Sequence, residues 1–355
     1  MKDLDEKTIR LIDRLEAEHC LTLEEYRYLV EHESQEAKAY IAPKARRIAD
    51  QVYGHDIYVR GLIEFSNYCK NNCYYCGIRA DNSRCDRYRL TEDVILKCCD
   101  DGYDYGYRTF VLQSGEDPYY TDDMLCRIIS KIRERHPDCA VTLSIGEKSY
   151  ESYKRYFEAG AQRYLLRHET ADKDHYGKLH PARMAFDHRM NCVRQLREIG
   201  YDVGIGMMIG APMQTSLNLA EDLKFIEQFQ PEMCGMGPFI PHDDTPFRDQ
   251  PAGTLDMTLY LLSIVRLICP HVLLPATTAL GTIHPLGREM GVEAGANVVM
   301  PNLSPTEVRQ KYLLYNNKIC TGEESAQCRG CLQARMSGIG YQVVVSRGDV
   351  KRPVA

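Results

Sequence analysis

Hydrophobic and polar positions follow two different rhythms along this chain. Within the first 50 residues, the runs TIRLIDRLEAEHCL and LEEYRYLVEHE carry apolar side chains at intervals of three and four, the spacing of one helix face. Thr22 and Glu25 add the spacing of a capping box to the second run. We therefore predict helices through residues 1–50.

Beyond residue 50, short runs of Val, Ile, Leu and Phe alternate with longer amphipathic segments. Short apolar runs bounded by turn residues are typical of buried strands, and several longer segments end in Gly, as helices often do. Eight strands are predicted in this way, at residues 57–65, 109–115, 140–146, 163–169, 202–210, 233–240, 271–278 and 296–301. Six helices are predicted between them, at residues 91–106, 121–136, 151–160, 184–200, 216–230 and 255–269.

Strands and helices that alternate in this way predict an α/β fold, a parallel (β/α)8 barrel of the TIM type. An open doubly wound sheet is the alternative, but eight strands over about 250 residues favour the closed barrel. The expected organisation is an N-terminal helical extension (1–50), the barrel (51–315) and a Cys-rich C-terminal extension (316–355). The chemistry of such a barrel belongs at the C-terminal ends of its strands.

Composition excludes several classes of protein. A formal net charge of -6 provides no basic surface for nucleic acid or an acidic membrane. The charged start lacks the apolar core of a secretory signal, and Arg266, Pro270 and His271 interrupt the longest apolar stretch, residues 257–276. Fifteen cysteines, an odd number, do not suit a secreted disulfide scaffold. We expect a cytoplasmic monomer that uses some of its cysteines to bind metal.

Three cysteines lie close together in CKNNCYYCGIR, directly after the first predicted strand. Cys69, Cys73 and Cys76 form a CxxxCxxC set, with the aromatic Tyr75 before the last cysteine. Thiolates are soft ligands for Fe–S clusters, zinc or Cu(I), and a cubane cluster usually takes four of them. Three ligands would leave one iron open, as catalytic zinc keeps an open position. A zinc knuckle and a cluster completed by a distant cysteine are the alternatives.

This motif, on the loop after the first strand, resembles that of the radical S-adenosylmethionine (radical SAM) superfamily, CxxxCxΦC. The resemblance implies a [4Fe-4S] cluster on Cys69, Cys73 and Cys76 whose open iron is chelated by S-adenosylmethionine. It also implies that an electron from an external donor cleaves the sulfonium and yields a 5′-deoxyadenosyl radical. The protein would then position and shield a cofactor that performs the difficult chemistry.

Other strand ends carry residues that suit this resemblance. QSGED, residues 113–117, resembles the segment that holds the amino group of the cofactor, and GIGMMIG, residues 204–210, resembles a glycine-rich strand that the cofactor approaches closely. Arg167 and Glu169 are two apart on a predicted strand and would share its inner face, although a structural ion pair is the alternative. The resemblance implies cofactor contacts at Tyr75, Gln113, Ser114, Gly115, Glu116, Glu169, Arg189, Met207 and Met300, and it adds Arg167 and Glu169 to the three cysteines as catalytic candidates.

Two later stretches narrow the resemblance. PATTALGTIHPLGREMGVEAGANVVMPNLSP and KICTGEESAQCRGC resemble the HydE family of [FeFe]-hydrogenase maturases. This implies assembly of the hydrogenase diiron subcluster alongside the maturases HydG and HydF, with a cysteine-bound iron carbonyl cyanide complex made by HydG as the small-molecule substrate. Small hydroxyls and one cation inside the barrel suit a small anionic ligand. The candidate substrate contacts are Thr142, Ser144, Arg167, Thr277, Thr278 and Tyr312.

The tail motif is a second cysteine set. Cys320, Cys328 and Cys331 have Cx7CxxC spacing, which by resemblance implies an auxiliary Fe–S cluster, [2Fe-2S] or [4Fe-4S]. Zinc, or no metal, is the alternative for this set. A mutase similar to methylornithine synthase and a sulfur-inserting enzyme similar to biotin synthase are the alternative enzymes, and both later stretches argue against them. A zinc-binding or electron-transfer module without catalysis would leave QSGED unexplained.

Overall fold

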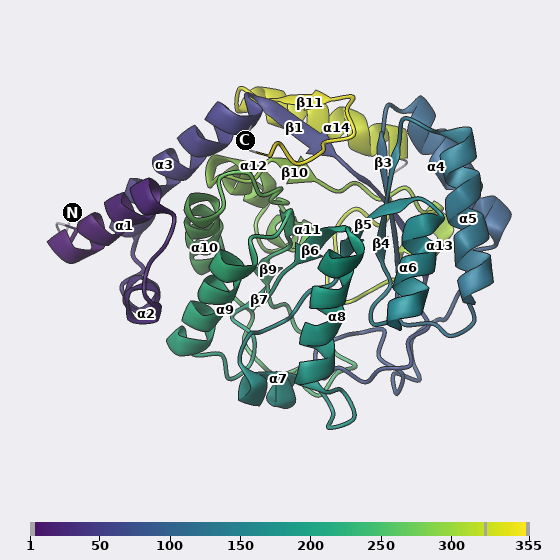
Figure 1. Ribbon diagram of the computed structural model, residues 1–355, viewed down its shortest axis with the longest axis horizontal. Helices are drawn as coiled ribbons and strands as arrows, with labels where there is room; N and C mark the ends of the chain where they lie inside the picture. Colours follow the sequence, from purple (N-terminus) through teal and green to yellow (C-terminus); the bar gives the residue numbers. More distant parts are fainter. Residues whose placement is uncertain (1–3, 323–324, 353–355) are drawn as a thin grey trace.

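Helices open the chain in the computed structural model, which describes residues 4–322 and 325–352, apart from the side chains of 325–328. The predicted capping box is present: the Thr22 hydroxyl accepts a hydrogen bond from the Glu25 N–H, and the Glu25 carboxylate accepts one from the Thr22 N–H. The third helix packs against the outside of the barrel (Figure 1). The helices are α1 (Glu6–Glu18), α2 (Leu23–Glu31) and α3 (Gln35–Tyr53).

A closed parallel barrel follows these helices. Its strands are β1 (Asp56–Val59), β2 (Gly61–Ser66), β3 (Thr109–Ser114), β4 (Ala140–Ser144), β5 (Ala161–Leu165), β6 (Asp202–Ile205), β7 (Met208–Ile209), β8 (Met233–Cys234), β9 (Gly237–Pro238), β10 (Val298–Val299) and β11 (Gln342–Val344). Six of them pair in the order β2-β3-β4-β5-β6-β8, all in parallel. The ring closes through the isolated bridges Met233–Leu273 and Pro275–Val298 and through the pairing of β10 with β1. The predicted barrel is therefore confirmed, and the open sheet is excluded.

Some predicted strands are interrupted in the structure. The first, residues 57–65, breaks at Arg60, so β1 joins β10 and β11 while β2 begins the barrel sheet. The fifth, residues 202–210, becomes β6 and β7 with Gly206 between them. A Cβ on Gly206 would lie 2.0 Å from the carbonyl oxygen of Gly235, so the two backbones come too close for any side chain.

The seventh predicted strand, residues 271–278, is reduced to single bridges at Leu273 and Pro275. Proline has no N–H to donate to a ladder, and Thr277 already caps the next helix. The short strand β11 was not predicted. Its pairing with β1 is decided by the fold, because the two strands lie almost 300 residues apart in the chain.

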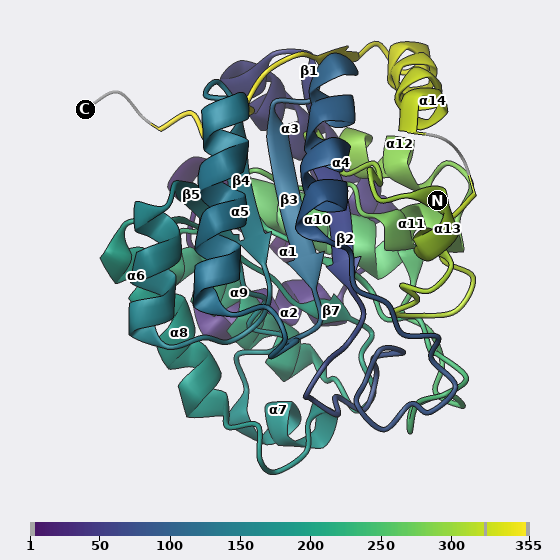
Figure 2. The same cartoon turned by 90° about the vertical axis from the view of Figure 1, so that its right-hand side faces the viewer.

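Helices cover the outside of the barrel as the pattern predicts (Figure 2). Five of them, α4, α5, α6, α9 and α10, begin after a Ser or Thr whose hydroxyl accepts a backbone N–H of the first turn. Figure 2 shows the loop after β2 at the lower end of the barrel and α14 at the upper end. The helices are α4 (Glu92–Asp104), α5 (Asp122–Arg135), α6 (Tyr150–Glu158), α7 (Lys173–Leu179), α8 (Phe186–Ile199), α9 (Ser216–Phe229), α10 (Leu255–Ile268), α11 (Thr278–Ile283), α12 (Gly287–Glu293), α13 (Thr306–Arg309) and α14 (Ser325–Gly338).

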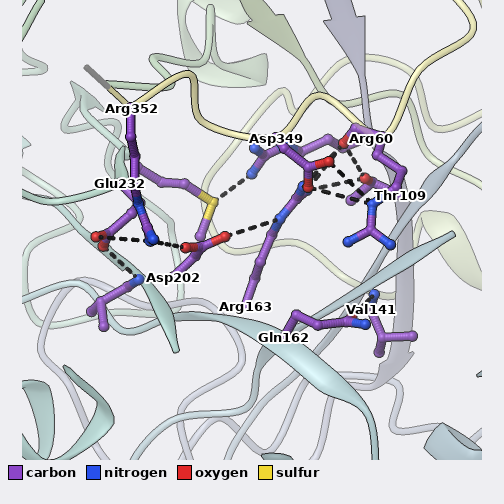
Figure 3. A network of polar contacts seen from close by, with 12 residues as sticks. Arg60, Thr109, Val141, Gln162, Arg163, Asp202, Glu232, Asp349 and Arg352 are labelled. Atoms are coloured by element: carbon purple, nitrogen blue, oxygen red, sulfur yellow. Dashed lines mark hydrogen bonds and ion pairs between the residues drawn. The ribbon is translucent and has the colours of Figure 1, made fainter. Parts of the chain in front are cut away.

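The C-terminal segment closes the N-terminal end of the barrel (Figure 3). The Arg163 side chain is 1% exposed and pairs with Asp349 at 2.5 Å. Its guanidinium also donates to the Thr109 hydroxyl at 3.0 Å and to the Arg347 carbonyl oxygen at 3.2 Å. The ion pairs at this end are structural, since chemistry in such barrels belongs at the opposite end.

Replacing Asp349 with asparagine is expected to lower the free energy of unfolding by about 1–2 kcal/mol, because the buried Arg163 loses its carboxylate. Asp249→Asn is the matched control: its pair with Arg248 has side chains 87% and 63% exposed. We expect the control to stay within about 0.5 kcal/mol of the parent. Chemical denaturation measures both, and equal losses would contradict the structural role of the Arg163 pair.

Acid should remove the stabilisation that the Asp349 carboxylate gives to the fold through Arg163. Burial alone would raise the pKa of Asp349, but the positive charges of Arg163 and Arg347 and their hydrogen bonds hold it below its ordinary value of 3.8. A carboxylate with a lowered pKa stabilises the fold above its unfolded pKa and loses that effect as the pH falls through the folded pKa. The difference between the parent and Asp349→Asn is therefore expected to be constant at neutral pH and to shrink below about pH 4.

Candidate active site

The motif cysteines lie on the loop after β2, at the mouth formed by the C-terminal strand ends. Sγ of Cys69 accepts the backbone N–H groups of Asn71 and Glu116, each at 3.4 Å. Burial, and then the charge of Cys69, raises the pKa of Cys76 to about 12. Thiols held in this way are poorly ionised alone, and a bound metal deprotonates them outright.

The described residues contain no three His, Cys, Asp or Glu side chains placed to hold a single metal ion. N–H groups that donate to a cysteine sulfur, as at Cys69, are contacts that tune iron–sulfur clusters. Two backbone N–H groups thus already point at the sulfur of one motif cysteine.

Backbone contacts hold the cysteine loop in shape. The Arg87 guanidinium donates to four carbonyl oxygens of residues 67–82. Gly77, directly after the last cysteine, donates its N–H to the Leu314 carbonyl oxygen at 2.9 Å. A Cβ on Gly77 would lie 2.2 Å from the carbonyl oxygen of Leu313, so only glycine fits here. The contact between Gly77 and Leu314 was not predicted, because its partners are far apart in sequence.

The end of β3 lies against this loop. A Cβ on Gly115 would lie 2.8 Å from that of Cys69. The buried Glu116 carboxylate accepts the Glu147 N–H at 2.9 Å and lies 3.2 Å from the Lys70 ammonium. The structure therefore places beside the cysteine loop a set of predicted cofactor residues, Gln113, Ser114, Gly115 and Glu116.

Tyr75 is partly buried within the cysteine loop. Its hydroxyl lies 3.1 Å from Nε2 of His180, and the two rings meet edge to face. His180 in turn contacts the Tyr176 carbonyl oxygen through Nδ1 at 2.9 Å. Burial lowers the pKa of His180 to about 3, so this ring is neutral. The aromatic residue before the last cysteine thus anchors the loop to α7.

Arg167 and Glu169 meet, but not in the predicted way. β5 ends at Leu165, so both residues lie on the loop beyond it. Glu169 has φ of 68°, a left-handed conformation that is uncommon outside glycine. Nη2 of Arg167 lies 3.2 Å from Oε2 of Glu169. The turn, and not an extended strand as predicted, brings the two side chains together.

This ion pair leaves hydrogen-bonding capacity unused. Nε and Nη2 of Arg167 and Oε2 of Glu169 are buried without a hydrogen bond. Arg189 donates to the Arg167 carbonyl oxygen at 3.1 Å, and Met207 pairs with Glu169 in a parallel bridge, so the predicted contacts converge here. Buried polar groups are rarely left without partners, so these atoms indicate a polar ligand. The residues present fit the cofactor that the motif implies.

His168, between these two residues, supports them from behind. The imidazole is fully buried, and its Nε2 lies 3.1 Å from Oδ1 of Asp222 on α9. Its Nδ1 accepts the Gly206 N–H at 3.3 Å, and the Gly206 carbonyl oxygen accepts the Glu169 N–H at 3.0 Å. Sequence reasoning missed His168. The available signal was the alternation of side chains along the predicted strand. If Arg167 and Glu169 face the barrel interior, the residue between them faces the surrounding helices.

The candidate substrate residues lie at different depths. Oγ1 of Thr142 is buried without a hydrogen bond and borders a small cavity inside the barrel together with Arg60 and Met300. Ser144 is two residues further along β4, toward the mouth. Burial lowers the pKa of Arg60 to about 9. Met300, predicted as a cofactor contact, thus lies deep in the barrel with Thr142.

The remaining candidates lie near the ends of the last strands. Thr277 caps α11 by accepting the Leu280 N–H, and Thr278 is the first residue of that helix. Tyr312 is 2% exposed, and its ring centre lies 5.0 Å from Nζ of Lys318. Capping occupies the Thr277 hydroxyl, which the sequence prediction did not anticipate.

A buried ion pair inside the barrel was also missed. Glu64 on β2 and Lys318 have side chains 1% and 7% exposed, with 2.5 Å between Oε1 and Nζ. Asn302 donates to the other oxygen of Glu64 at 2.7 Å. Glu64 lay within an apolar predicted strand, and Lys318 lay in a tail that sequence reasoning treated separately. No sequence signal joined residues this far apart.

Two tail cysteines lie near one arginine. A hydrogen bond to Glu289 raises the pKa of Arg335, and the charges of Cys331 and Cys320 add to this effect. Cys331 is exposed and Cys320 is partly buried. The Cys328 side chain lies outside the described residues, so the predicted triplet is not tested as a set.

Comparisons with known proteins agree with this geometry. The radical SAM superfamily matches residues 63–226. The chain is 43% identical over 310 residues to the [FeFe] hydrogenase maturase subunit HydE of Thermotoga maritima, covering 86% of this chain and 88% of that protein. It is 30% identical over 298 residues to 3-methylornithine synthase of Methanosarcina barkeri, covering 82% and 83%. The crystal structure of methylornithine synthase (PylB) matches with a TM-score of 0.82 and 25% identity, covering 94% and 97%.

The barrel, the cysteine set at its mouth and the superfamily match define a radical SAM enzyme. Membership of this superfamily implies a [4Fe-4S] cluster and S-adenosylmethionine as cofactors. Within it, the chain belongs to the HydE family of [FeFe]-hydrogenase maturases, with 43% identity over most of both chains. In the part of the chain that the structure describes, every helix is too short or too polar to cross a membrane.

Proposed function

We propose that this enzyme acts on a small iron complex during assembly of the diiron subcluster of [FeFe]-hydrogenase. The observation that carries the proposal is the cysteine set at the barrel mouth beside the unsatisfied Arg167–Glu169 pair, in a chain of the HydE family. The substrate by family resemblance is a cysteine-bound iron carbonyl cyanide complex supplied by HydG. HydF and an external electron donor complete the proposed set of partners.

Different residues at the mouth would hold the cluster and S-adenosylmethionine. Cys69, Cys73 and Cys76 would bind the [4Fe-4S] cluster, with Tyr75 anchoring their loop. Bound S-adenosylmethionine would supply the 5′-deoxyadenosyl radical. Nε of Arg167 and Oε2 of Glu169, which make no hydrogen bond, offer a donor and an acceptor to its polar groups. The remaining proposed contacts with the cofactor are Gln113, Ser114, Gly115, Glu116, Arg189 and Met207.

The barrel interior would receive the substrate. The unpaired hydroxyl of Thr142 inside the barrel and the guanidinium of Arg167 on the loop beyond β5 would each offer donors to a small anionic molecule. Enclosure matters because the radical would otherwise react unproductively with groups other than the substrate. The other proposed substrate contacts are Ser144, Thr277, Thr278 and Tyr312, and Met300 would line the same cavity.

One experiment tests the reaction class. The protein is reconstituted anaerobically with iron and sulfide, reduced, and mixed with S-adenosylmethionine. We expect 5′-deoxyadenosine to form with time and only in the reduced sample. A cluster that forms without releasing 5′-deoxyadenosine would contradict the proposal.

We propose an auxiliary iron–sulfur cluster, [2Fe-2S] or [4Fe-4S], on Cys320, Cys328 and Cys331. Arg335 lies near both Cys320 and Cys331, and Arg288 donates a weak hydrogen bond to the Cys320 sulfur at 3.5 Å, which supports a shared site. Cys320 precedes α14 and the other two cysteines lie on it, and α14 lies toward the end of the barrel opposite the cysteine loop (Figure 2). The auxiliary cluster is therefore not expected to take part in the reaction at the mouth.

Replacing all three tail cysteines with alanine is expected to lower the iron content while 5′-deoxyadenosine formation stays within about twofold of the parent. Iron assay and product analysis of the same sample measure both quantities. Cys20→Ala removes an exposed cysteine outside either motif and should change neither. Loss of 5′-deoxyadenosine in the triple variant would show that the tail site is needed for catalysis.

A further inference from the structure

We propose that Lys318 is a positioning residue that holds residues 311–318 across the barrel mouth, and we call this segment the strap. That Lys318 holds the strap is inferred from contacts within the protein alone. Its consequence for the reaction rests on the proposed function.

The strap contacts the loops of several strands. The Lys311 carbonyl oxygen accepts a hydrogen bond from the Asn67 side chain at 2.6 Å, directly before the cysteine loop. The Leu314 carbonyl oxygen accepts the Gly77 N–H at 2.9 Å, directly after Cys76. Further along, the Asn316 N–H donates to the Pro241 carbonyl oxygen at 3.0 Å. The strap is therefore part of the wall against which the cysteine loop is built.

Lys318 is the buried charged contact of the strap. Its ammonium donates to Glu64 at 2.5 Å and to the Tyr312 carbonyl oxygen at 2.9 Å, and it lies 5.0 Å from the centre of the Tyr312 ring. Glu64 is on the inner face of β2 and is also held by Asn302. A buried carboxylate that loses its cation is costly, so the strap is bound firmly to the barrel at this point.

The position of Lys318 separates the strap from the tail cysteines. Lys318 is two residues before Cys320, and its partners belong to the barrel and to the strap itself. Removing the tail cluster therefore leaves the Glu64 contact in place. Removing the ammonium, in contrast, releases the strap and with it the Gly77 contact beside Cys76. The reaction should thus depend on Lys318 more than on the tail cysteines.

The first test uses metal-free protein, so that it does not depend on any cofactor. Hydrogen exchange is followed in peptides that cover residues 74–82, which include the Gly77 amide. Lys318→Met should speed exchange there by about tenfold or more, because strap contacts that hold the loop closed are lost. Lys318→Arg should restore most of the protection. Lys311→Met, whose ammonium pairs with Asp86 at 2.8 Å on a more exposed part of the strap, is the matched control and should not change exchange.

A second variant separates loss of the strap contact from misfolding caused by an unpaired buried charge. Glu64→Gln/Lys318→Met removes both charges, so no unpaired carboxylate is left buried, and it should also speed exchange at residues 74–82. Unchanged exchange in this folded double variant would overturn the proposal.

The second test uses the reconstituted enzyme. Lys318→Met should raise the KM for S-adenosylmethionine by about tenfold, with Lys318→Arg close to the parent, because a loosened cysteine loop holds the cofactor less well. An unchanged KM would overturn the role of Lys318 in the reaction. If the parent itself releases no 5′-deoxyadenosine, the proposed function fails while the exchange result still decides the role of Lys318 in holding the strap.

Discussion

Replacing Cys76 with alanine should abolish 5′-deoxyadenosine formation, to below about one thousandth of the parent rate, because the cofactor carries the reaction. Cys76 is one of three thiols that would hold the cluster, and its side chain is partly buried. The variant is reconstituted, reduced and assayed with S-adenosylmethionine beside the parent. Iron content and the absorbance of the cluster are measured on the same samples.

Cys85→Ala is the control for this result. Cys85 lies nine residues further along the same loop and is likewise partly buried. Its sulfur accepts a weak hydrogen bond from Asn67 at 3.5 Å and belongs to neither motif. The control should keep its iron and its activity. If Cys76→Ala were as active as Cys85→Ala, the three-thiol site would be wrong.

Glu169→Gln should raise the KM for S-adenosylmethionine by about 10–100-fold, the effect of losing one hydrogen bond to a charged group. Glutamine keeps the size of the side chain and replaces one carboxylate oxygen with an amide. The buried Oε2 of Glu169 has Arg167 at 3.2 Å and no hydrogen bond, so it is available to a cofactor amine. Initial rates of 5′-deoxyadenosine release over a range of cofactor concentrations measure the change.

Glu158→Gln is the matched substitution on the surface. Glu158 closes α6, its side chain is 63% exposed, and it lies 4.0 Å from Lys154. This variant should have the KM of the parent. A KM in Glu169→Gln that equals that of Glu158→Gln would remove Glu169 from the cofactor site.

Local patterns predicted the scaffold well. The capping box at Thr22 and the apolar runs of β3 and β4 depend on neighbours in sequence, and all three form as predicted. The three-cysteine loop was predicted at a strand end, and the closed barrel places it at the mouth. These features were accessible because their spacing alone specifies them.

Features that depend on distant partners were not accessible. Glu64 and Lys318 are 254 residues apart, and only the folded barrel makes them neighbours. The left-handed turn at Glu169 is fixed by a contact to Gly206, which lies between β6 and β7. Arg163 has its carboxylate at Asp349, in a tail that no pattern assigned to the barrel. In each case a long-range contact decides the conformation, so alternation and propensity gave no sign of it.

The most direct test of the central claim is a maturation assay. An [FeFe]-hydrogenase maturation mixture that contains HydG and HydF but no HydE is supplemented with this protein, and hydrogen evolution by the hydrogenase is measured. We predict that activity appears with the parent and not with Cys76→Ala. Failure to restore hydrogen evolution, together with production of 3-methylornithine by the same preparation, would contradict the assignment to hydrogenase maturation.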